Sequence, residues 1–294
     1  MKKHQLFIVA AAVLWGLIGT FAKLLSAAGL TVMQCVAVRV GLAAVLYTLF
    51  LLATDRAALK IRLRDLPYFL GTGIASLLFF NWCYFSAIQQ SSMAVAAVLL
   101  YTAPAFVIGM SAALFHERLT RGKGIALGFT LLGCLLVTGA LGGGRISFSA
   151  FLYGIGAGFG YALYSVIGKF ALQKYSPKTV TVYTFLFAAA GALPLSRLWQ
   201  AGAVLLRLDV IFGGLAIAVL CCIAPYLLYT AGLEKTPPGQ AAILATVEPV
   251  TAAAVGTLFF HEPLTAAKTV GIVLVIGAIV LLSAGSSKKN TENP

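Results

Sequence analysis

Charged residues are rare in this sequence. Of its 294 residues only 8 are Asp or Glu and 21 are Lys or Arg, so charged side chains make up 10% of the chain. A soluble domain carries roughly 25% charged residues, whereas 61% of this chain is hydrophobic. The composition therefore excludes an ordinary soluble enzyme or binding domain, and no polar stretch is long enough to form a linker or a second, soluble domain.

Cysteine is also scarce. The five cysteines all lie inside apolar stretches, and none has the spacing of a metal ligand set. We interpret them as small buried or lipid-facing residues, because a disulfide framework or a zinc site needs paired or clustered cysteines. Neither a metal ion nor another cofactor is expected. The five are Cys35, Cys83, Cys134, Cys221 and Cys222.

Long apolar runs, by contrast, are abundant. A helix that crosses the hydrocarbon core of a bilayer needs about 20 apolar residues, and ten runs long enough to span follow one another along the chain. The predicted fold class is therefore an all-α integral membrane protein with ten transmembrane helices. The runs cover residues 5–26, 32–53, 66–88, 91–115, 121–140, 149–172, 179–197, 209–233, 239–260 and 266–284.

The basic residues predict the orientation of these spans. The net charge of +13 could indicate a nucleic-acid partner, but the basic residues separate apolar runs and form no stripe, so none is expected. Cytoplasmic loops of membrane proteins are enriched in Lys and Arg. The distribution predicts a multi-pass protein of the inner (cell) membrane with both termini in the cytoplasm. The inner set is Lys2, Lys3, Arg56, Lys60, Arg62, Arg64, Arg118, Arg121, Lys123, Lys174, Lys178, Lys235, Lys288 and Lys289, against Arg145, Arg197, Arg207 and Lys268 outside.

The chain contains an internal repeat. The pentapeptide 116–120 (His-Glu-Arg-Leu-Thr) follows the fourth run and 261–265 (His-Glu-Pro-Leu-Thr) follows the ninth, 145 residues later. Pro104 and Pro249 align at the same separation. Each copy has five spans, an odd number, so the second copy must enter the membrane from the opposite side. Such an inverted-topology repeat is typical of secondary transporters.

We therefore divide the chain into a first five-helix repeat at 1–141, a second at 149–284 and a cytoplasmic tail at 285–294. The start of the chain mimics a signal peptide, because Lys2 and Lys3 precede an apolar run. Cleavage there would remove the first helix of a repeated unit, so this run is expected to be a retained span.

With its Trp15-Gly16 and Glu248-Pro249 pairs and its two Glu-x-Leu-Thr segments, the chain resembles the drug/metabolite transporter superfamily, in its ten-helix class with two EamA-type repeats. The resemblance covers nearly the whole chain and implies a carrier with a central cavity between the halves. It also implies that the first, third, fourth, sixth, eighth and ninth helices line that cavity. The matching residues are Trp15, Gly16, Lys23, Arg39, Pro104, Glu117, Leu119, Thr120, Lys169, Glu248, Pro249, Glu262, Leu264 and Thr265.

Glu248 lies near the middle of the ninth span. A charge at the bilayer centre costs about 2.5–3.5 kcal/mol on insertion scales, so this carboxylate is expected to face a cavity or a partner. One interpretation is a transport site that binds a proton or a substrate ammonium group. The other is a fixed ion pair with Lys23, Lys169 or Arg39.

Three basic residues also fall within spans. Lys23 and Lys169 occupy equivalent places at the ends of the first and sixth runs. Either snorkels to the interface, or it serves as a gate charge or as a site for a substrate carboxylate. For Arg39, in the second span, pairing with backbone carbonyls or a nearby acid is favoured over substrate contact.

Pro104 and Pro249 lie within the fourth and ninth spans. Proline removes a backbone donor, and helix breaks at equivalent places of two repeats are the usual pointer to a transport site. We expect a hinge or cavity-shaping role, with a static kink as the alternative.

Aromatic and polar side chains concentrate in the spans expected to line the cavity. Such side chains are apolar with a polar handle and suit a flat or amphiphilic solute. Any one of them could instead face lipid or the interface. Together with Glu248, the candidate cavity residues are Trp15, Asn81, Tyr84, Tyr101, Tyr161 and Tyr226.

The two His-Glu pairs invite comparison with the zinc motif HExxH. The second histidine is absent, because Thr120 and Thr265 stand in its place. We expect each segment to end one helix and begin the next, with the threonine as N-cap and the glutamate paired with a loop arginine or lysine.

The predicted function is the export of a small organic metabolite, amino-acid-like or amphiphilic and aromatic, by alternating access. Partners would be the solute and the lipid bilayer, with protons as a candidate coupling ion. Alternatives are an importer or exchanger, a lipid or undecaprenyl-type flippase of the same fold, and a channel. An enzyme is not expected, because catalysis inside the membrane would need more than the one central acid found.

Overall fold

The computed structural model describes residues 1–139 and 147–288, with side chains described up to residue 282. The predicted repeat boundary at 141, Arg145, Lys289 and the end of the predicted tail lie outside the described residues. Over the described ranges, nine helical segments are long and apolar enough to cross a membrane, and a tenth apolar stretch covers Ala266–Leu282. The ten-span, all-helical prediction is confirmed.

The first repeat contains five spans. Three of them consist of more than one helical segment, and the loop after the second span holds a 3-10 turn, η1 (Arg56–Leu59). The spans are α1 (Lys3–Trp15) with α2 (Ile18–Ala27); α3 (Val32–Thr54); η2 (Leu63–Asp65), α4 (Leu66–Leu70), η3 (Gly71–Leu78) and α5 (Phe79–Gln90); α6 (Met93–Leu100) with α7 (Ala103–Phe115); and α8 (Arg121–Thr138).

The second repeat has the same order of spans. A 3-10 segment, η5 (Leu198–Leu206), joins its second and third spans. The spans are α9 (Phe148–Ala171); α10 (Pro177–Ser196); α11 (Leu208–Ala218), η6 (Val219–Ile223) and α12 (Ala224–Glu234); α13 (Pro238–Leu244) with α14 (Val247–Phe260); and α15 (Ala266–Lys288).

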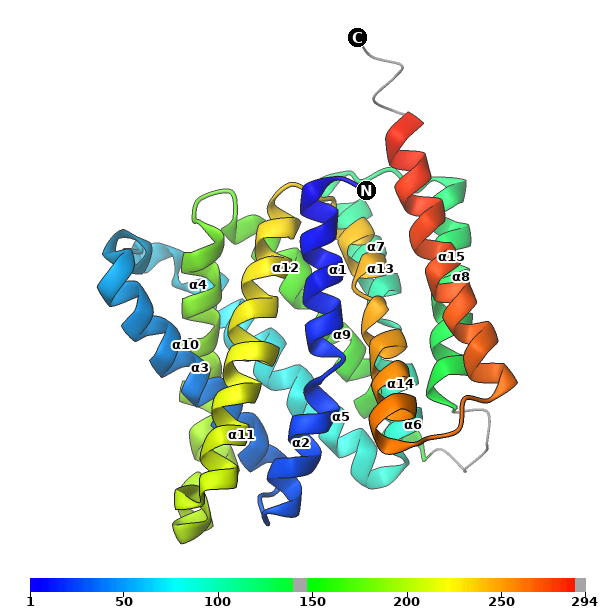
Figure 1. The fold of residues 1–294 in the computed structure, drawn as a ribbon. Coiled ribbons are helices and arrows are strands. Elements are labelled where there is room, and N and C mark those ends of the chain that lie inside the picture. Colours follow the sequence, from blue (N-terminus) through cyan, green and yellow to red (C-terminus); the bar gives the residue numbers. More distant parts are fainter. Residues whose placement is uncertain (140–146, 289–294) are drawn as a thin grey trace.

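Helix pairing follows the inverted symmetry. The start of the first span, α1, packs on α12 in the third span of the other repeat, and α9 packs in the same way on α5. The equivalent spans α3 and α10 pack together at one edge of the bundle, and α8 and α15 pack together at the other (Figure 1). We call the side where α1 begins and α15 ends the terminal side, and the other the opposite side.

The fourth and ninth spans are both broken near the middle. Between α6 and α7, Thr102 donates a hydrogen bond to the carbonyl of Leu99 (2.6 Å), and between α13 and α14 Thr246 donates one to the carbonyl of Ile243 (2.6 Å). Pro104 lies in the first turn of α7 and Pro249 in the first turn of α14. A proline is well placed there, because the first turn of a helix has no intrahelical acceptor for its N–H groups.

The third and eighth spans each contain a π-helical stretch, η3 and η6. Hydropathy did not reveal these stretches. A π turn widens the helix and often occurs at functional sites. At Gly73 in η3 a Cβ atom would lie 2.8 Å from the carbonyl oxygen of Thr184, so the wide stretch fits closely against α10.

The two His-Glu segments adopt the same structure. His116 and His261 end α7 and α14 in the left-handed conformation (φ 52° and 53°). Thr120 caps α8 by accepting from the N–H of Lys123 (3.3 Å), and Thr265 accepts from the N–H of Lys268 (3.2 Å). The predicted threonine caps are confirmed.

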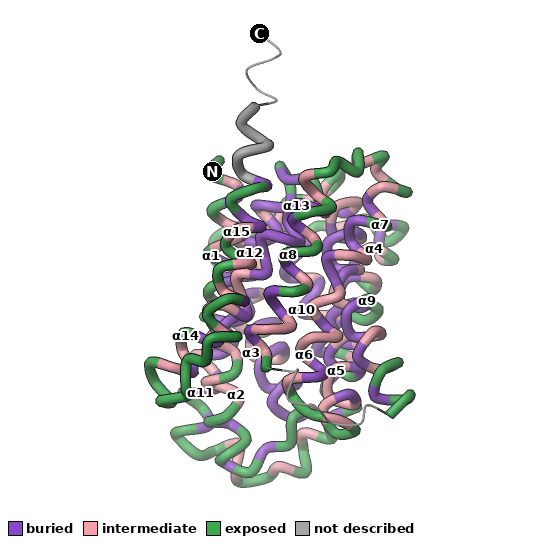
Figure 2. Tube along the Cα trace, turned by 90° about the vertical axis from the view of Figure 1, so that its right-hand side faces the viewer, coloured by how far each residue is buried: buried purple, intermediate pink, exposed green. Residues whose placement is uncertain are grey.

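Burial separates the protein interior from the lipid-facing surface (Figure 2). Buried side chains run through the middle of the bundle, whereas large apolar side chains stay exposed on its outside. Val45 on α3, Leu132 on α8 and Val273 on α15 are 57%, 49% and 63% exposed. Exposed apolar side chains at mid-span are what a lipid-facing surface requires.

The edge pair α8 and α15 approaches at two glycines. A Cβ atom at Gly133 would lie 2.9 Å from the carbonyl oxygen of Gly271, and one at Gly271 would lie 2.7 Å from that of Gly133. Small residues allow membrane helices to pack backbone against backbone. These two glycines therefore fix the distance between α8 and α15.

We expect Gly133→Ala to separate α8 from α15 and to lower the free energy of unfolding by about 1–3 kcal/mol, the usual cost of overpacking. Gly128→Ala, on the same helix, is the matched control, because a Cβ there has nothing within 4 Å. Melting temperatures in detergent would check this. Equal melting temperatures for the two variants would contradict it.

Candidate functional site

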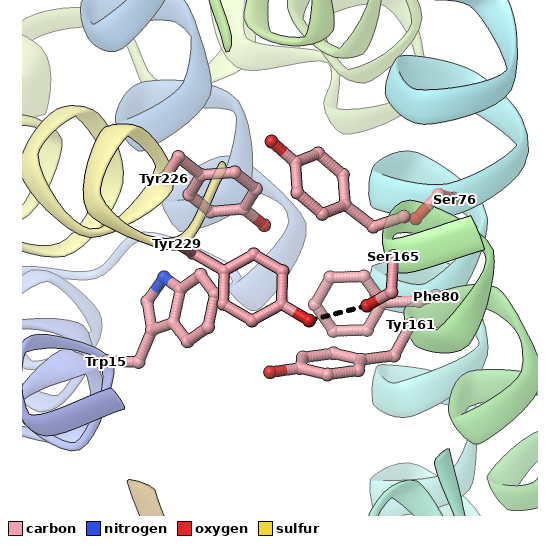
Figure 3. Close-up of a pocket in the computed structure, with 8 residues that line it drawn as sticks. Trp15, Ser76, Phe80, Tyr161, Ser165, Tyr226 and Tyr229 are labelled. Atoms are coloured by element: carbon pink, nitrogen blue, oxygen red, sulfur yellow. Dashed lines mark hydrogen bonds between the residues drawn. The ribbon is translucent and has the colours of Figure 1, made fainter. Parts of the chain in front are cut away.

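A pocket lies where the two repeats meet (Figure 3). Its walls come from α1 in the first span, η3 and α5 in the third, α9 in the sixth and α12 in the eighth. The side chains are mostly aromatic, with two serines among them. The lining residues are Trp15, Ser76, Phe80, Tyr161, Tyr164, Ser165, Tyr226 and Tyr229.

The aromatic rings contact one another edge to face. Trp15 lies 5.3 Å from Tyr226 and 5.2 Å from Tyr229 between ring centroids, and Tyr161 lies 5.6 Å from Phe80. Tilted and edge-to-face pairs at these distances are the favoured arrangements of aromatic side chains. The pocket therefore presents ring faces and edges together with phenolic hydroxyls.

Two hydrogen bonds fix the phenols of α9 and α12. Ser165 and Tyr229 share a hydrogen bond of 2.6 Å between their oxygens, and Tyr164 and Thr230 share one of 2.7 Å. All four residues are buried. Buried hydroxyls with fixed partners hold the rings in one orientation.

Glu248 lies next to this pocket. Its Oε2 accepts a long hydrogen bond from the Tyr161 hydroxyl (3.5 Å), and the carboxylate makes no ion pair within the described residues. The residue lies in the first turn of α14, where the partial positive charge of a helix N-terminus favours an anion. Neither Lys23, Lys169 nor Arg39 forms the fixed ion pair considered above.

The break in the first span also contacts Glu248. A Cβ atom at Gly16, between α1 and α2, would lie 2.9 Å from the carbonyl oxygen of Glu248 and 2.5 Å from Cβ of Thr251. Only glycine fits this approach. Gly158 of α9 lies just as close to the break of the fourth span, where its Cβ would be 2.6 Å from the hydroxyl of Thr102.

Arg39 points to Asn81 and not to an acid. Its Nη2 donates to Asn81 Oδ1 (2.9 Å), and Asn81 Nδ2 donates to the carbonyl of Leu77 (2.6 Å). Arg39 and Asn81 are both buried. The partner is a side-chain amide, whereas the sequence favoured a backbone carbonyl or a carboxylate.

Three of the seven predicted cavity residues, Trp15, Tyr161 and Tyr226, line the pocket, and Glu248 contacts it through Tyr161. Asn81 is engaged with Arg39 instead. Tyr84 and Tyr101 pack against neighbouring apolar clusters and are not among the lining residues.

Five lining residues were absent from the predicted set. Phe80, Tyr164 and Tyr229 belong to spans where aromatics were noted, but their faces could not be distinguished by sequence. Ser76 lies in the π-helical η3, and Ser165 occupies a buried turn of α9. No motif distinguishes these two serines from the other serines of the chain. Alignment of the repeats does not help for Ser165, because the equivalent residue is Gly19.

On the terminal side, Lys169, Lys123 and Glu117 make a set of contacts that we call the terminal-side network, and Glu117 joins the two repeats. Lys169 donates to the carbonyl oxygens of Leu233 (2.8 Å), Glu234 (2.9 Å) and Thr236 (3.2 Å), around the connection from α12 to α13. These contacts tie α9 to the end of the eighth span.

Glu117 completes the terminal-side network. It accepts from Lys123 (2.7 Å) and from the backbone N–H of Gly239 in α13 (3.2 Å). All seven residues of α13 are buried, and the rings of Phe115 and Phe170 lie 4.5 Å apart between centroids. The terminal side of the bundle is closed.

The equivalent residues on the opposite side, which we call the opposite-side network, form longer and more exposed ion pairs. Glu262 lies 3.5 Å from Lys268 and 3.8 Å from Lys23, measured from carboxylate oxygen to Nζ. The side chains of Lys23 and Glu262 are 56% and 45% exposed, against 18% and 10% for Lys123 and Glu117. The opposite side is the more open end.

We expect Tyr229→Phe and Ser165→Ala each to lower the free energy of unfolding by about 1–3 kcal/mol, because each leaves a buried hydroxyl without its partner. The double variant should cost less than the sum of the two, as expected for residues in contact. Denaturant unfolding in detergent would measure the cycle, with Tyr153→Phe as control. Additive effects would contradict a coupling between the two hydroxyls.

The fold matches a solved structure over its full length. A crystal structure of a protein superposes with a TM-score of 0.81, covers 97% of this chain and 98% of its own, and shares 18% identity. At this identity the likeness shows the fold alone.

Curated relatives match more closely in sequence. An uncharacterized transporter of Archaeoglobus fulgidus is 30% identical over 67% of this chain and 70% of its own length. The threonine/homoserine exporter RhtA of Escherichia coli K12 is 30% identical over 70% of this chain and 66% of its own. A second Archaeoglobus fulgidus transporter, also uncharacterized, is 25% identical over 95% of this chain and 98% of its own.

The model of the EamA-like transporter family matches twice, at residues 2–139 and 148–284. The two matches correspond to the two five-helix repeats, and between them they cover nearly the whole chain. This chain therefore belongs to the EamA-like transporter family, within the drug/metabolite transporter superfamily.

Proposed function

We propose that this protein exports a small amino-acid-like solute across the inner membrane by alternating access. The observation that carries the proposal is the pair of equivalent networks, one closed and one open, on either side of a pocket lined by both repeats. The relative RhtA is named as a threonine/homoserine exporter, which supports an amino-acid-like substrate. The positive-inside distribution of loop charges supports the terminal side as cytoplasmic.

Inverted symmetry specifies the contacts of the proposed alternate state. Alignment of the repeats places Lys23 at the position of Lys169, and Ile88, Gln89 and Ser91 at those of its three carbonyl acceptors. Lys23 would donate to these carbonyls, and Glu262 would accept from the N–H of Ala94, the residue equivalent to Gly239. The terminal-side network would separate at the same time, exposing the pocket to the cytoplasm.

Glu248 is proposed as the charged residue of the transport site. It lies beside the pocket, at the N-terminus of a half-helix and without an ion-pair partner among the described residues. A carboxylate in this position can bind a substrate ammonium group or carry a proton between the two states. The phenols of α9 and α12 would contact the body of the solute.

Cells that overproduce the wild-type protein should enrich a few small metabolites in spent medium, and Glu248→Gln should lose most of that enrichment, because glutamine keeps the size but not the charge. Untargeted metabolite profiling is the measurement. Asp209→Asn is the control, since Asp209 is an exposed carboxylate at the start of α11 and belongs to neither network.

Depletion of metabolites from the medium would indicate uptake and overturn the direction proposed. Equal enrichment by wild type and Glu248→Gln would keep export and reject the role of Glu248. If a correctly inserted wild-type protein changes no metabolite, transbilayer movement of labelled lipid in vesicles would test the flippase alternative.

The alternating states can be followed with two equivalent cysteine pairs. In a background without the native cysteines, Phe115→Cys with Phe170→Cys reports closure of the terminal side, and Leu24→Cys with Phe260→Cys reports closure of the opposite side. Lys169→Met should weaken the terminal-side network, slowing disulfide formation in the first pair and speeding it in the second.

Lys23→Met should speed disulfide formation in the first pair and slow it in the second, because it removes the equivalent lysine of the alternate state. Lys60→Met is the control, because Lys60 is exposed in the loop after α3 and forms no ion pair among the described residues. Parallel changes in both pairs, or none in either, would refute the exchange between the two networks.

A further inference from the structure

Arg39 is a buried cation with most of its hydrogen-bonding capacity unused. The residue is 8% exposed and lies in the first half of α3. Among the described residues its only side-chain hydrogen bond runs from Nη2 to Asn81, and Nε is buried without a partner. A guanidinium has five N–H donors, so this arrangement leaves the group far from satisfied.

The surroundings of Arg39 contain no acid in contact. The guanidinium is near enough for its charge to be felt by Cys222, Tyr226 and Glu248, without contact to the carboxylate. No carboxylate oxygen of a described residue lies within ion-pairing distance of it. An unpaired cation inside the membrane is expensive and normally marks a pathway or a ligand site.

Arg39 is also close to the pocket. Val36 and Val40, which flank it on α3, pack in one apolar cluster with Phe80 and Tyr226, and both of these aromatics line the pocket. Asn81 directly follows Phe80 in α5, and its amide is oriented by its bond to the Leu77 carbonyl. Ser76, which lines the pocket, also has a buried hydroxyl without a partner.

The chemistry of the unused donors selects an anion of a definite shape. The planar guanidinium fork matches a carboxylate, which can accept two parallel hydrogen bonds. Asn81 accepts from one N–H of Nη2, which leaves the Nε–H and the remaining N–H groups of the guanidinium for such a ligand. An acid built into the protein would fill this position permanently, and none is present among the described residues.

We propose that Arg39, oriented by Asn81, binds the carboxylate of the transported solute, while Glu248 binds its ammonium group, so that the protein selects zwitterions. This inference rests on the proposed transport function. It assigns buried Arg39 and half-buried Glu248, which lie on different repeats, to the two ends of one solute. Each charge is then neutralised only when the solute is present.

The alternative is a static role, in which Arg39 only orients Asn81 and offsets the charge of Glu248. The two roles predict different effects of replacing Arg39 on the transport of solutes with and without a carboxylate. A static arginine affects all solutes equally, whereas a carboxylate site affects only those that carry a carboxylate.

The experiment uses the full-length protein in proteoliposomes and labelled L-homoserine. Competitors are 3-aminopropan-1-ol, which lacks the carboxylate, and 4-hydroxybutanoate, which lacks the ammonium group. For the wild-type protein, unlabelled homoserine should inhibit transport of the label at concentrations at least roughly tenfold lower than either analogue requires. Arg39→Gln should abolish the preference over 3-aminopropan-1-ol, and Glu248→Gln should abolish that over 4-hydroxybutanoate. Arg56→Gln, in a loop, is the matched control.

Asn81→Asp keeps the test valid if Arg39→Gln fails to fold. The new carboxylate would pair with Arg39 inside the protein and compete with the solute, so homoserine transport should fall at least roughly tenfold without loss of thermal stability. Wild-type-like transport by Asn81→Asp, or identical solute preferences in Arg39→Gln and Arg56→Gln, would overturn the inference and leave the proposed function intact. Wild type that transports no amino acid would overturn the proposed amino-acid substrate as well.

Discussion

The structure depends on one constraint, that backbone polar groups inside a bilayer must find partners within the protein. Three of the ten spans are interrupted, at Gly16–Leu17, Tyr101–Thr102 and Ala245–Thr246. Irregular backbone of this kind is tolerated only where protein covers it. Two of the breaks are covered by a glycine contact, Gly16 against Glu248 and Gly158 against Thr102. The interruptions therefore gather where the repeats meet, and the pocket forms beside them.

The inverted repeat makes one sequence pattern serve two faces of the membrane. Each copy of the His-Glu-x-Leu-Thr segment ends one helix, caps the next and holds a glutamate near a lysine. In this structure the first copy also reaches across to α13, whereas the second copy does not reach α6 in the same way. Two equivalent elements in different arrangements are what a protein with two states of similar energy requires.

Most of the fold could be predicted from the sequence. Hydropathy located all ten spans to within a few residues, because a bilayer imposes a minimum length of apolar helix. Repeat alignment predicted the matching helix breaks near Pro104 and Pro249 and the caps at Thr120 and Thr265.

The site was harder to predict, because helical phase is ambiguous where every face of a helix is apolar. Tyr84 and Tyr101 were assigned to the cavity and lie outside the lining set, and Ser76 and Ser165 were missed. The π-helical stretches in the third and eighth spans rotate the helix face on which later residues lie. Hydropathy cannot detect this rotation.

The glutamates of the two networks bear on the relative free energies of the two proposed states. Glu117 has Lys123 at 2.7 Å and the Gly239 N–H, and Glu262 has Lys268 at 3.5 Å with Lys23 nearby. Each carboxylate thus keeps a lysine of its own repeat whether its side of the bundle is closed or open. Closing one side would add a charge-assisted backbone hydrogen bond, worth about 1.5–3 kcal/mol, and would leave no buried charge unpaired on the other side. Because the side that opens would lose an equivalent bond, the two proposed states can have similar free energies.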